Sequence, residues 1–165
     1  MVRPETHADK RRESGGGIGL DMKDIESRTD IDLIMRVFYE RALADEVIGY
    51  IFTDVAKLDL EHHLPIIGDF WETMLFHVGN YSRHGRNPLE VHKALHLRSS
   101  LSRDHFVRWL KIFVTSVDEE FQGERAEFLK MRAFSIASRF QESLDLPDTA
   151  EPSLSEIPAE ARSHR

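Results

Sequence analysis

The chain contains no cysteine among its 165 residues. It therefore forms no disulfide and offers no thiolate to a metal, so any soft metal ligand has to come from its nine histidines or five methionines. No apolar run approaches the roughly eighteen residues that suggest a membrane-spanning helix. The formal net charge is −7 and the basic residues form no long stripe, which argues against a nucleic-acid partner. The N-terminus lacks the apolar segment of a secretory signal, so we expect a cytoplasmic protein that does not bind membranes.

Both ends of the chain lack the apolar periodicity of folded elements. Residues 1–20 are polar, basic and glycine-rich, and residues 147–165 are rich in proline, serine, glutamate and alanine. Segments of this kind bury too little apolar surface to fold. We therefore expect a disordered N-terminal extension, one globular domain over residues 21–146, and a disordered C-terminal tail.

Between these ends apolar residues recur at helical spacing, and no segment alternates as a strand would. A capping box of Thr29 and Asp32 opens the first predicted helix, which ends near Ala44. A second long helix begins near Leu60 and has Pro65 in its first turn, where proline is tolerated. Further helices are predicted around 47–52, from Pro88, after Ser102, and over 124–144. The pattern predicts an all-α domain.

One short predicted helix carries a histidine among leucines and valine. Asn87 and Pro88 have the residue types preferred at the N-cap and the first helical position, so His92 follows one turn later. Neutral imidazole is a common metal ligand, but spacing alone favours a histidine hydrogen-bonded to a carbonyl. His96 follows four residues after His92, but the pair lacks the glutamate of the HExxH zinc motif. This absence argues against a zinc site.

Three more polar side chains border the apolar faces of predicted helices, namely Tyr39, His63 and Trp109. Each has an ordinary explanation as a core-edge tyrosine, a surface histidine or a packed tryptophan. If Tyr39 or Trp109 is enclosed, its polar hydrogen needs a partner, because an unpaired buried group costs about 1–3 kcal/mol. Taken one at a time, these residues do not indicate a site.

Taken together, the residues resemble the truncated hemoglobins, and within them group III. The resemblance runs from about Thr29 to Leu144 and rests on an ordered series of segments rather than on any one of them. The series comprises Val37-Phe38-Tyr39-Glu40, Ile51-Phe52, His63, Ile67-Gly68-Asp69-Phe70-Trp71, Asn87-Pro88-Leu89, His92, His105-Phe106, Arg108-Trp109-Leu110, Phe113, Ala133 and Ile136-Ala137.

This resemblance implies a truncated globin fold, with helices packed two on two around heme b (iron protoporphyrin IX). His92 would be the proximal iron ligand, and the distal pocket would contain Tyr39, His63 and Trp109. The apolar walls around the cofactor would be formed by Phe38, Phe52, Phe70 and Trp71.

Two departures from the family pattern affect this assignment. Aligning backwards from Trp109 would bring His96 to the proximal position, so His96 counts among the cofactor-binding candidates. The spacing from the helix start to the ligand favours His92. Pro65 lies two residues after His63 and leaves the direction of His63 open.

The resemblance also implies that the heme binds dioxygen or a related small ligand such as NO, CO or peroxide. Hydrogen bonds from Tyr39 and Trp109 to a partly negative ligand would contribute about 1.5–3 kcal/mol each, which slows its release. Slow release suits NO dioxygenation or peroxide activation, supported by a reductase, better than oxygen transport. Two alternatives stay open: a gas or redox sensor that signals through the tails, and a helical scaffold that has lost its heme.

Overall fold

Seven helical segments make up the regular structure of the described residues, 22–78 and 81–146, in the computed structural model. The predicted disordered segments, 1–20 and 147–165, lie outside those residues. None of the helices in this described part of the chain combines the length and apolar character needed to cross a bilayer. The segments are α1 (Arg28–Ala44), the π-helix η1 (Ile51–Val55), α2 (Leu60–Phe76), the 3₁₀-helix η2 (Tyr81–His84), α3 (Pro88–Ser99), α4 (Arg103–Asp118) and α5 (Glu124–Ser143). The all-α prediction is confirmed.

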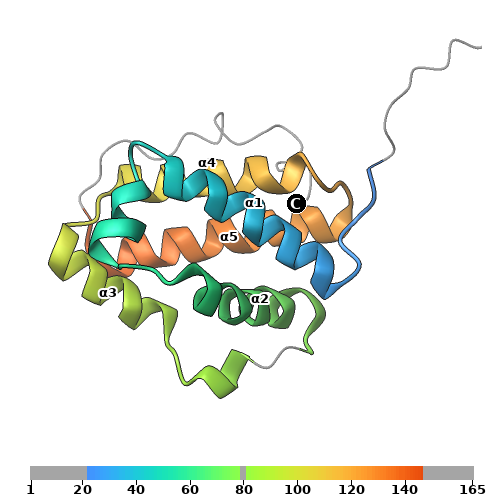
Figure 1. The fold of residues 1–165 in the computed structure, drawn as a ribbon, viewed down its shortest axis with the longest axis horizontal. Helices are drawn as coiled ribbons and strands as arrows, with labels where there is room; N and C mark the ends of the chain where they lie inside the picture. Colours follow the sequence, from blue (N-terminus) through green and yellow to red (C-terminus); the bar gives the residue numbers. More distant parts are fainter. Residues whose placement is uncertain (1–21, 79–80, 147–165) are drawn as a thin grey trace, which may run out of the picture.

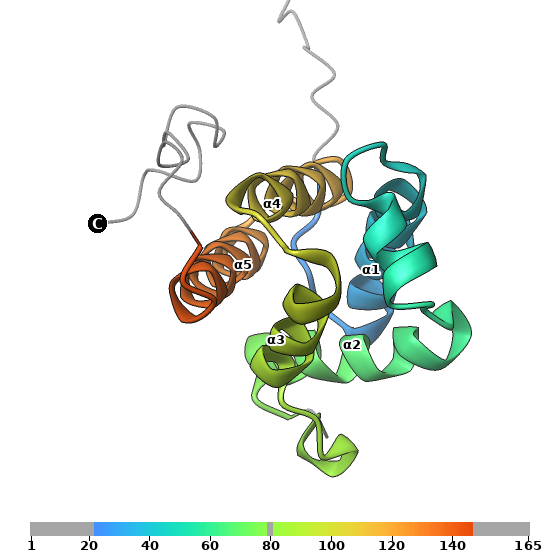
Figure 2. The same ribbon diagram turned by 90° about the vertical axis from the view of Figure 1, so that its left-hand side faces the viewer.

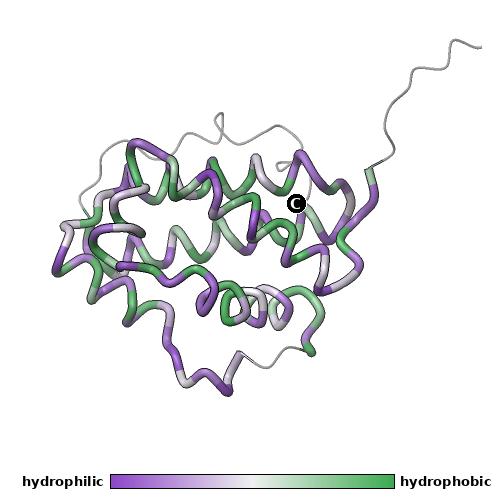
Figure 3. Tube along the Cα trace, viewed as in Figure 1, coloured by the Kyte–Doolittle hydropathy of each residue, from purple (hydrophilic) through white to green (hydrophobic). Residues whose placement is uncertain are grey.

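The four long helices α1, α2, α4 and α5 form a frame around one core. Helix α1 packs on α2 and α4 packs on α5, while α1 also contacts α4 and α2 contacts α5 (Figure 1). Apolar residues recur along each of these helices (Figure 3). The fully buried side chains of the frame include Ile31, Ile34, Phe113, Val117, Leu129 and Ala133. Helix α3 lies at one end of the frame, between the α1–α2 side and the α4–α5 side (Figure 2).

Helix α1 begins two residues earlier than the sequence predicts. Its N-cap is Ser27, whose backbone N–H donates to the carboxylate of Asp30 at 3.0 Å. The predicted box at Thr29 and Asp32 is therefore wrong, since Asp32 instead accepts from Arg28 at 2.8 Å. Both pairs have the same spacing, and the structure distinguishes them by the burial of Asp30 and by its bonds to the backbone N–H groups of Glu26 and Ser27.

Helix α2 begins at Leu60 as predicted, and the side chain of Asp59 accepts from the backbone N–H of His62 at 3.2 Å. Pro65 is the sixth residue of the helix, so it lies beyond the first turn where the sequence predicts it. A proline there leaves the carbonyl of Glu61 without its intrahelical donor. Glu61 is exposed, which allows water to supply that donor.

The starts of α3 and α4 follow the predicted residues. The side chain of Asn87 accepts from the backbone N–H of Leu89 at 3.1 Å, with Pro88 at the first helical position. The backbone N–H of Ser102 donates to Nδ1 of His105 at 3.0 Å at the start of α4. Although both ends of α3 are well defined, none of its twelve residues is buried.

Helix α5 takes its N-terminal cap from a distant part of the chain. Gly123 precedes the helix with φ of +148°, a conformation that side chains disfavour. The carboxylate of Asp24 accepts from the backbone N–H groups of Arg125 and Ala126, both at 3.0 Å. A Cβ at position 123 would lie 2.4 Å from Asp24, so the close approach itself requires glycine.

Candidate functional site

A cavity of about 460 Å³ lies between α3 and the frame. Its volume is within the roughly 300–1,000 Å³ of ordinary small-molecule sites. Among the described residues, no carboxylate lines it, and most of its wall is aliphatic or aromatic. The predicted wall residues that line it are Phe52, Phe70 and Trp71, and the predicted polar residues that line it are Tyr39, His63, His92 and Trp109.

His92 is held in one orientation on α3. Its Nδ1 lies 2.7 Å from the carbonyl oxygen of Pro88, so Nδ1–H donates and the lone pair of Nε2 is left free. The ring packs between Phe140, at 4.5 Å between centroids, and Phe106, at 6.2 Å. Burial lowers the pKa of His92, and the bond to Pro88 opposes this effect only in part. The lowered pKa keeps the imidazole neutral near pH 7. A neutral, oriented imidazole at a cavity wall has the form that a metal ligand requires.

Tyr39 and His63 form a hydrogen-bonded pair across the cavity wall. The hydroxyl of Tyr39 lies 2.7 Å from Nε2 of His63, and the ring of Phe52 packs edge-on against Tyr39. The direction of His63, which Pro65 left open, is therefore inward. Burial lowers the pKa of His63 to about 4, with a smaller contribution from the charge of Arg86. Burial also raises the pKa of Tyr39, so both groups are neutral near pH 7.

The tautomer of His63 determines what Tyr39 offers to the cavity. If the hydroxyl of Tyr39 donates to Nε2, its oxygen presents only lone pairs to the cavity. If Nε2–H of His63 donates instead, the hydroxyl proton of Tyr39 is free to donate elsewhere. The pair can thus supply either a donor or an acceptor without any change in net charge.

Trp109 lies in the wall, and Phe38 lies behind it. The indole of Trp109 stacks on Phe113, with centroids 5.3 Å apart, and also lines the cavity. Phe38 is 2% exposed and contacts Tyr39 and Trp109 edge-on, at 4.9 and 5.7 Å. It does not line the cavity, in contrast to its predicted place in the wall, and it supports the two residues that do.

His96 is also absent from the cavity lining. It lies one turn after His92 on α3. Its Nδ1 is buried and has no hydrogen-bond partner among the described residues. The structure therefore brings His92, and not His96, to the wall that faces Tyr39, His63 and Trp109.

Two arginines that the sequence analysis missed also line the cavity. Arg86 lies between η2 and α3, and Arg98 lies near the end of α3. Within the described part of the chain, neither is paired with a carboxylate. Tyr81 and His105 also line the cavity with polar side chains, and the sequence analysis did not predict either of them as a site residue. Nothing in the local sequence distinguishes Arg86 from other loop arginines, because its place depends on how the segment folds back over α2.

Comparisons with known proteins give one consistent match. No family model matches the sequence. The chain is 31% identical over 121 residues to the group 3 truncated hemoglobin ctb of Campylobacter jejuni, covering 72% of this chain and 91% of that protein. The structure aligns with the crystal structure of the group III truncated hemoglobin from Campylobacter jejuni at a TM-score of 0.65 and 31% identity. That alignment covers 74% of this chain and 95% of the other.

Proposed function

The chain belongs to the group III truncated hemoglobins, and on this premise we propose that it holds heme b through His92 and carries out redox chemistry on dioxygen, nitric oxide or peroxide. Membership of the family implies heme and a diatomic ligand. The observation that carries the proposal is the neutral imidazole of His92, with Nδ1–H bonded to Pro88 and Nε2 free at the wall of a largely apolar cavity.

The cavity fits a flat, largely apolar cofactor that has acidic groups at its edge. Aromatic rings of α2, α4 and α5 form much of the wall. Arg86 and Arg98 have no carboxylate partner among the described residues and would pair with the cofactor's two carboxylates. The sequence contains no cysteine, so it offers no thioether attachment of the c type, which supports the noncovalent b type.

Heme, when bound, supplies an iron that binds small diatomic ligands and exchanges electrons. His92 would bind that iron through Nε2, and its hydrogen bond to Pro88 would hold the ring orientation and raise the basicity of the ligand. Phe106 and Phe140 restrict the ring from two sides. The helix that carries the ligand therefore needs only one well-oriented nitrogen.

The hydroxyl of Tyr39 and the indole N–H of Trp109 are the donors for a ligand that gains negative charge on binding. Each such bond contributes about 1.5–3 kcal/mol, equivalent to roughly ten- to hundredfold slower release. His63 determines whether the proton of Tyr39 is available, because it binds the same hydroxyl at 2.7 Å. A pocket that retains its ligand in this way suits redox chemistry better than oxygen delivery.

Absorption spectra test the proposal directly. We expect the purified protein, with hemin supplied, to give heme spectra in the ferric, ferrous and CO-bound states. A protein that takes up no hemin would contradict the proposal. Rapid nitrate formation from NO in the presence of O₂ would support the dioxygenase activity. No nitrate formation together with no peroxide turnover would contradict the redox assignment while leaving ligand binding in place.

Tyr39→Phe tests the distal donor. We expect O₂ to dissociate about ten- to hundredfold faster, because one charge-assisted hydrogen bond is lost. The measurement is stopped-flow displacement of O₂ by CO. The matched control is Tyr50→Phe, since Tyr50 is 41% exposed and does not line the cavity. An unchanged rate in Tyr39→Phe would remove Tyr39 from this role.

A further inference from the structure

We propose that Asp69 is a positioning residue, which holds residues 81–86 over the edge of the cavity and thereby sets how long the cofactor stays bound. We call residues 81–86 the strap. The proposal rests on heme as the cofactor. It gives a role to Gly68 and Asp69, neither of which lines the cavity.

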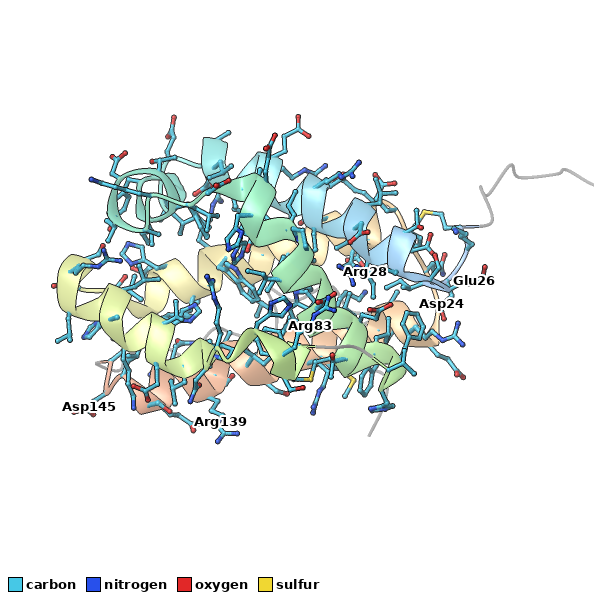
Figure 4. The ribbon with its side chains drawn as sticks, turned by 60° about the horizontal axis from the view of Figure 1, so that its bottom comes forward. Asp24, Glu26, Arg28, Arg83, Arg139 and Asp145 are labelled. Atoms are coloured by element: carbon cyan, nitrogen blue, oxygen red, sulfur yellow. The ribbon has the colours of Figure 1, made fainter. Side chains whose placement is uncertain are left out.

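Asp69 is 5% exposed and accepts hydrogen bonds from three directions. Its Oδ1 accepts from Arg28 of α1 at 2.6 Å. Its Oδ2 accepts from Arg83 and from Nε2 of His84, both at 2.8 Å and both in the strap. Burial alone would raise the pKa of Asp69, but these donors lower it to about 2, so the carboxylate stays charged. Figure 4 shows Arg28 and Arg83 beside α2.

Gly68 makes the arrangement on the α1 side possible. A Cβ at this position would lie 2.5 Å from a terminal nitrogen of Arg28. Without it, the guanidinium lies across α2 and also donates to the carbonyl of Pro65 at 3.1 Å and to Glu72 at 3.0 Å. Arg28 thus fixes one oxygen of Asp69 from the frame, and the other oxygen is left for the strap.

The strap contributes two residues to the cavity wall, Tyr81 and Arg86. Tyr81 packs edge-on against Phe70 at 5.1 Å between centroids, but no residue of η2 is buried. Burial raises the pKa of Tyr81 and lowers that of His63, and the charge of Arg86 acts as a smaller, lowering effect on both, so Arg86 lies close to the distal side. Apolar packing therefore holds the strap weakly, and its bonds to Asp69 are its main attachment to the frame.

A cofactor that leaves past the strap has to displace Tyr81 and Arg86 from the cavity wall. That movement breaks the bonds of Asp69 to Arg83 and His84. Asp69 touches neither the cavity nor the distal donors, so its effect should appear in cofactor release and not in ligand binding.

The test compares Asp69→Asn with Asp30→Asn in the holoprotein. Asp30 is a fair control because it is 6% exposed and pairs with Lys23 at 2.7 Å, at the far end of α1 from Tyr39. We expect hemin transfer to an acceptor apoglobin to become about tenfold faster in Asp69→Asn, which is equivalent to the loss of one charge-assisted hydrogen bond. Asp30→Asn should stay near the wild-type rate. Equal rates in the two variants would overturn the proposal.

Hydrogen exchange in the heme-free protein provides a second measurement. Exchange in the strap should rise in Asp69→Asn and not in Asp30→Asn, including at Gly85, whose N–H donates to Ser82. Unchanged strap exchange would overturn the proposal whether or not heme binds. Failure to take up any hemin would instead contradict the proposed function.

A milder variant covers the case in which Asp69→Asn fails to fold. His84→Leu removes one donor from the strap and leaves Arg28 and Arg83 on Asp69. We expect faster hemin loss than in the wild type and slower loss than in Asp69→Asn. A wild-type rate in His84→Leu, in a protein that folds normally, would overturn the role of the strap.

Discussion

The frame and helix α3 differ in what covers their apolar side chains. In the frame, residues such as Phe113 and Leu129 are completely enclosed by other side chains of the protein. On α3 no residue is buried, and Leu97 is 85% exposed. The side chains of α3 that face inward, including Leu95, are only partly buried against the core, and they also line the cavity. The frame is thus stabilised by its own side chains, whereas α3 also faces a cavity that a bound cofactor would fill.

This difference follows from the physics of short helices. A twelve-residue helix is marginal by itself in water, so its stability has to come from packing or from its ends. Helix α3 has a cap at Asn87 and few contacts with the frame. A cofactor bound to His92 would supply the missing packing surface, and it would also join α3 to the distal side.

Three leucine substitutions provide the strongest test of this difference between the frame and α3. Leu129→Ala removes a fully buried side chain of the frame and should lower the unfolding free energy of the heme-free protein by about 2–5 kcal/mol. Leu97→Ala should change it by no more than about 0.5 kcal/mol, because the side chain is exposed. Leu95→Ala should act mainly on hemin retention. Chemical denaturation with and without hemin measures all three, and a large effect of Leu97→Ala would contradict the account of α3.

Replacement of the proximal ligand should have the next largest effect. Binding to the native state alone stabilises it by about 4 kcal/mol when free ligand exceeds the dissociation constant a thousandfold. His92→Gly should therefore lose hemin and most of the hemin-dependent rise in melting temperature. The heme-free protein should lose only about 1 kcal/mol, because glycine is unfavourable inside a helix. His96→Gly is the matched control one turn away. If His96→Gly loses hemin and His92→Gly keeps it, the assignment of His92 is wrong.

The pH dependence should be the smallest of these effects. His63 has a pKa of about 4 in the folded protein and about 6.5 when unfolded, so between these values the unfolded state binds more protons. The contribution of His63 to the unfolding free energy of the heme-free protein should therefore be fully present above about pH 6.5 and should be lost as the pH falls towards 4. The lowered pKa of His92 acts in the same direction. His63→Leu should flatten this slope in urea titrations across the range.

The control for the pH dependence is His62→Leu, at the exposed position next to His63. This substitution should change the slope only slightly, because the charge of His62 is the smallest of the effects that lower the pKa of His63. A slope that is equally steep in wild type and in His63→Leu would show that the buried imidazole does not titrate on unfolding. In that case the pairing of His63 with Tyr39 would not persist in solution.

Helix boundaries were the most predictable part of the fold. Asn87 with Pro88 and Ser102 mark starts that the structure confirms, because a cap depends on residues only two or three positions apart. The start of α1 was harder, since two identical spacings compete and the burial of Asp30 decides between them. The cap of α5 could not be predicted, because Asp24 lies about a hundred residues away along the chain.

The candidate site was predictable where one side chain faces inward from a regular helix. Tyr39, His63, His92 and Trp109 all line the cavity, where the family resemblance places them, although none of them indicates a site when taken alone. Phe38 is the exception, because it is adjacent to Tyr39 in sequence but packs behind it and does not line the cavity. Arg86 escaped prediction because its position depends on the path of a loop over α2.

The amino-acid order by itself determined the five α-helices, the one among them that carries His92 and the family to which the chain belongs, because these depend on local spacing and residue type. Only the tertiary structure decided which histidine of α3 reaches the cavity, that His63 turns inward to Tyr39, and that Asp69 binds the strap. Those outcomes depend on distances between helices that are far apart in the chain, and local patterns do not encode such distances.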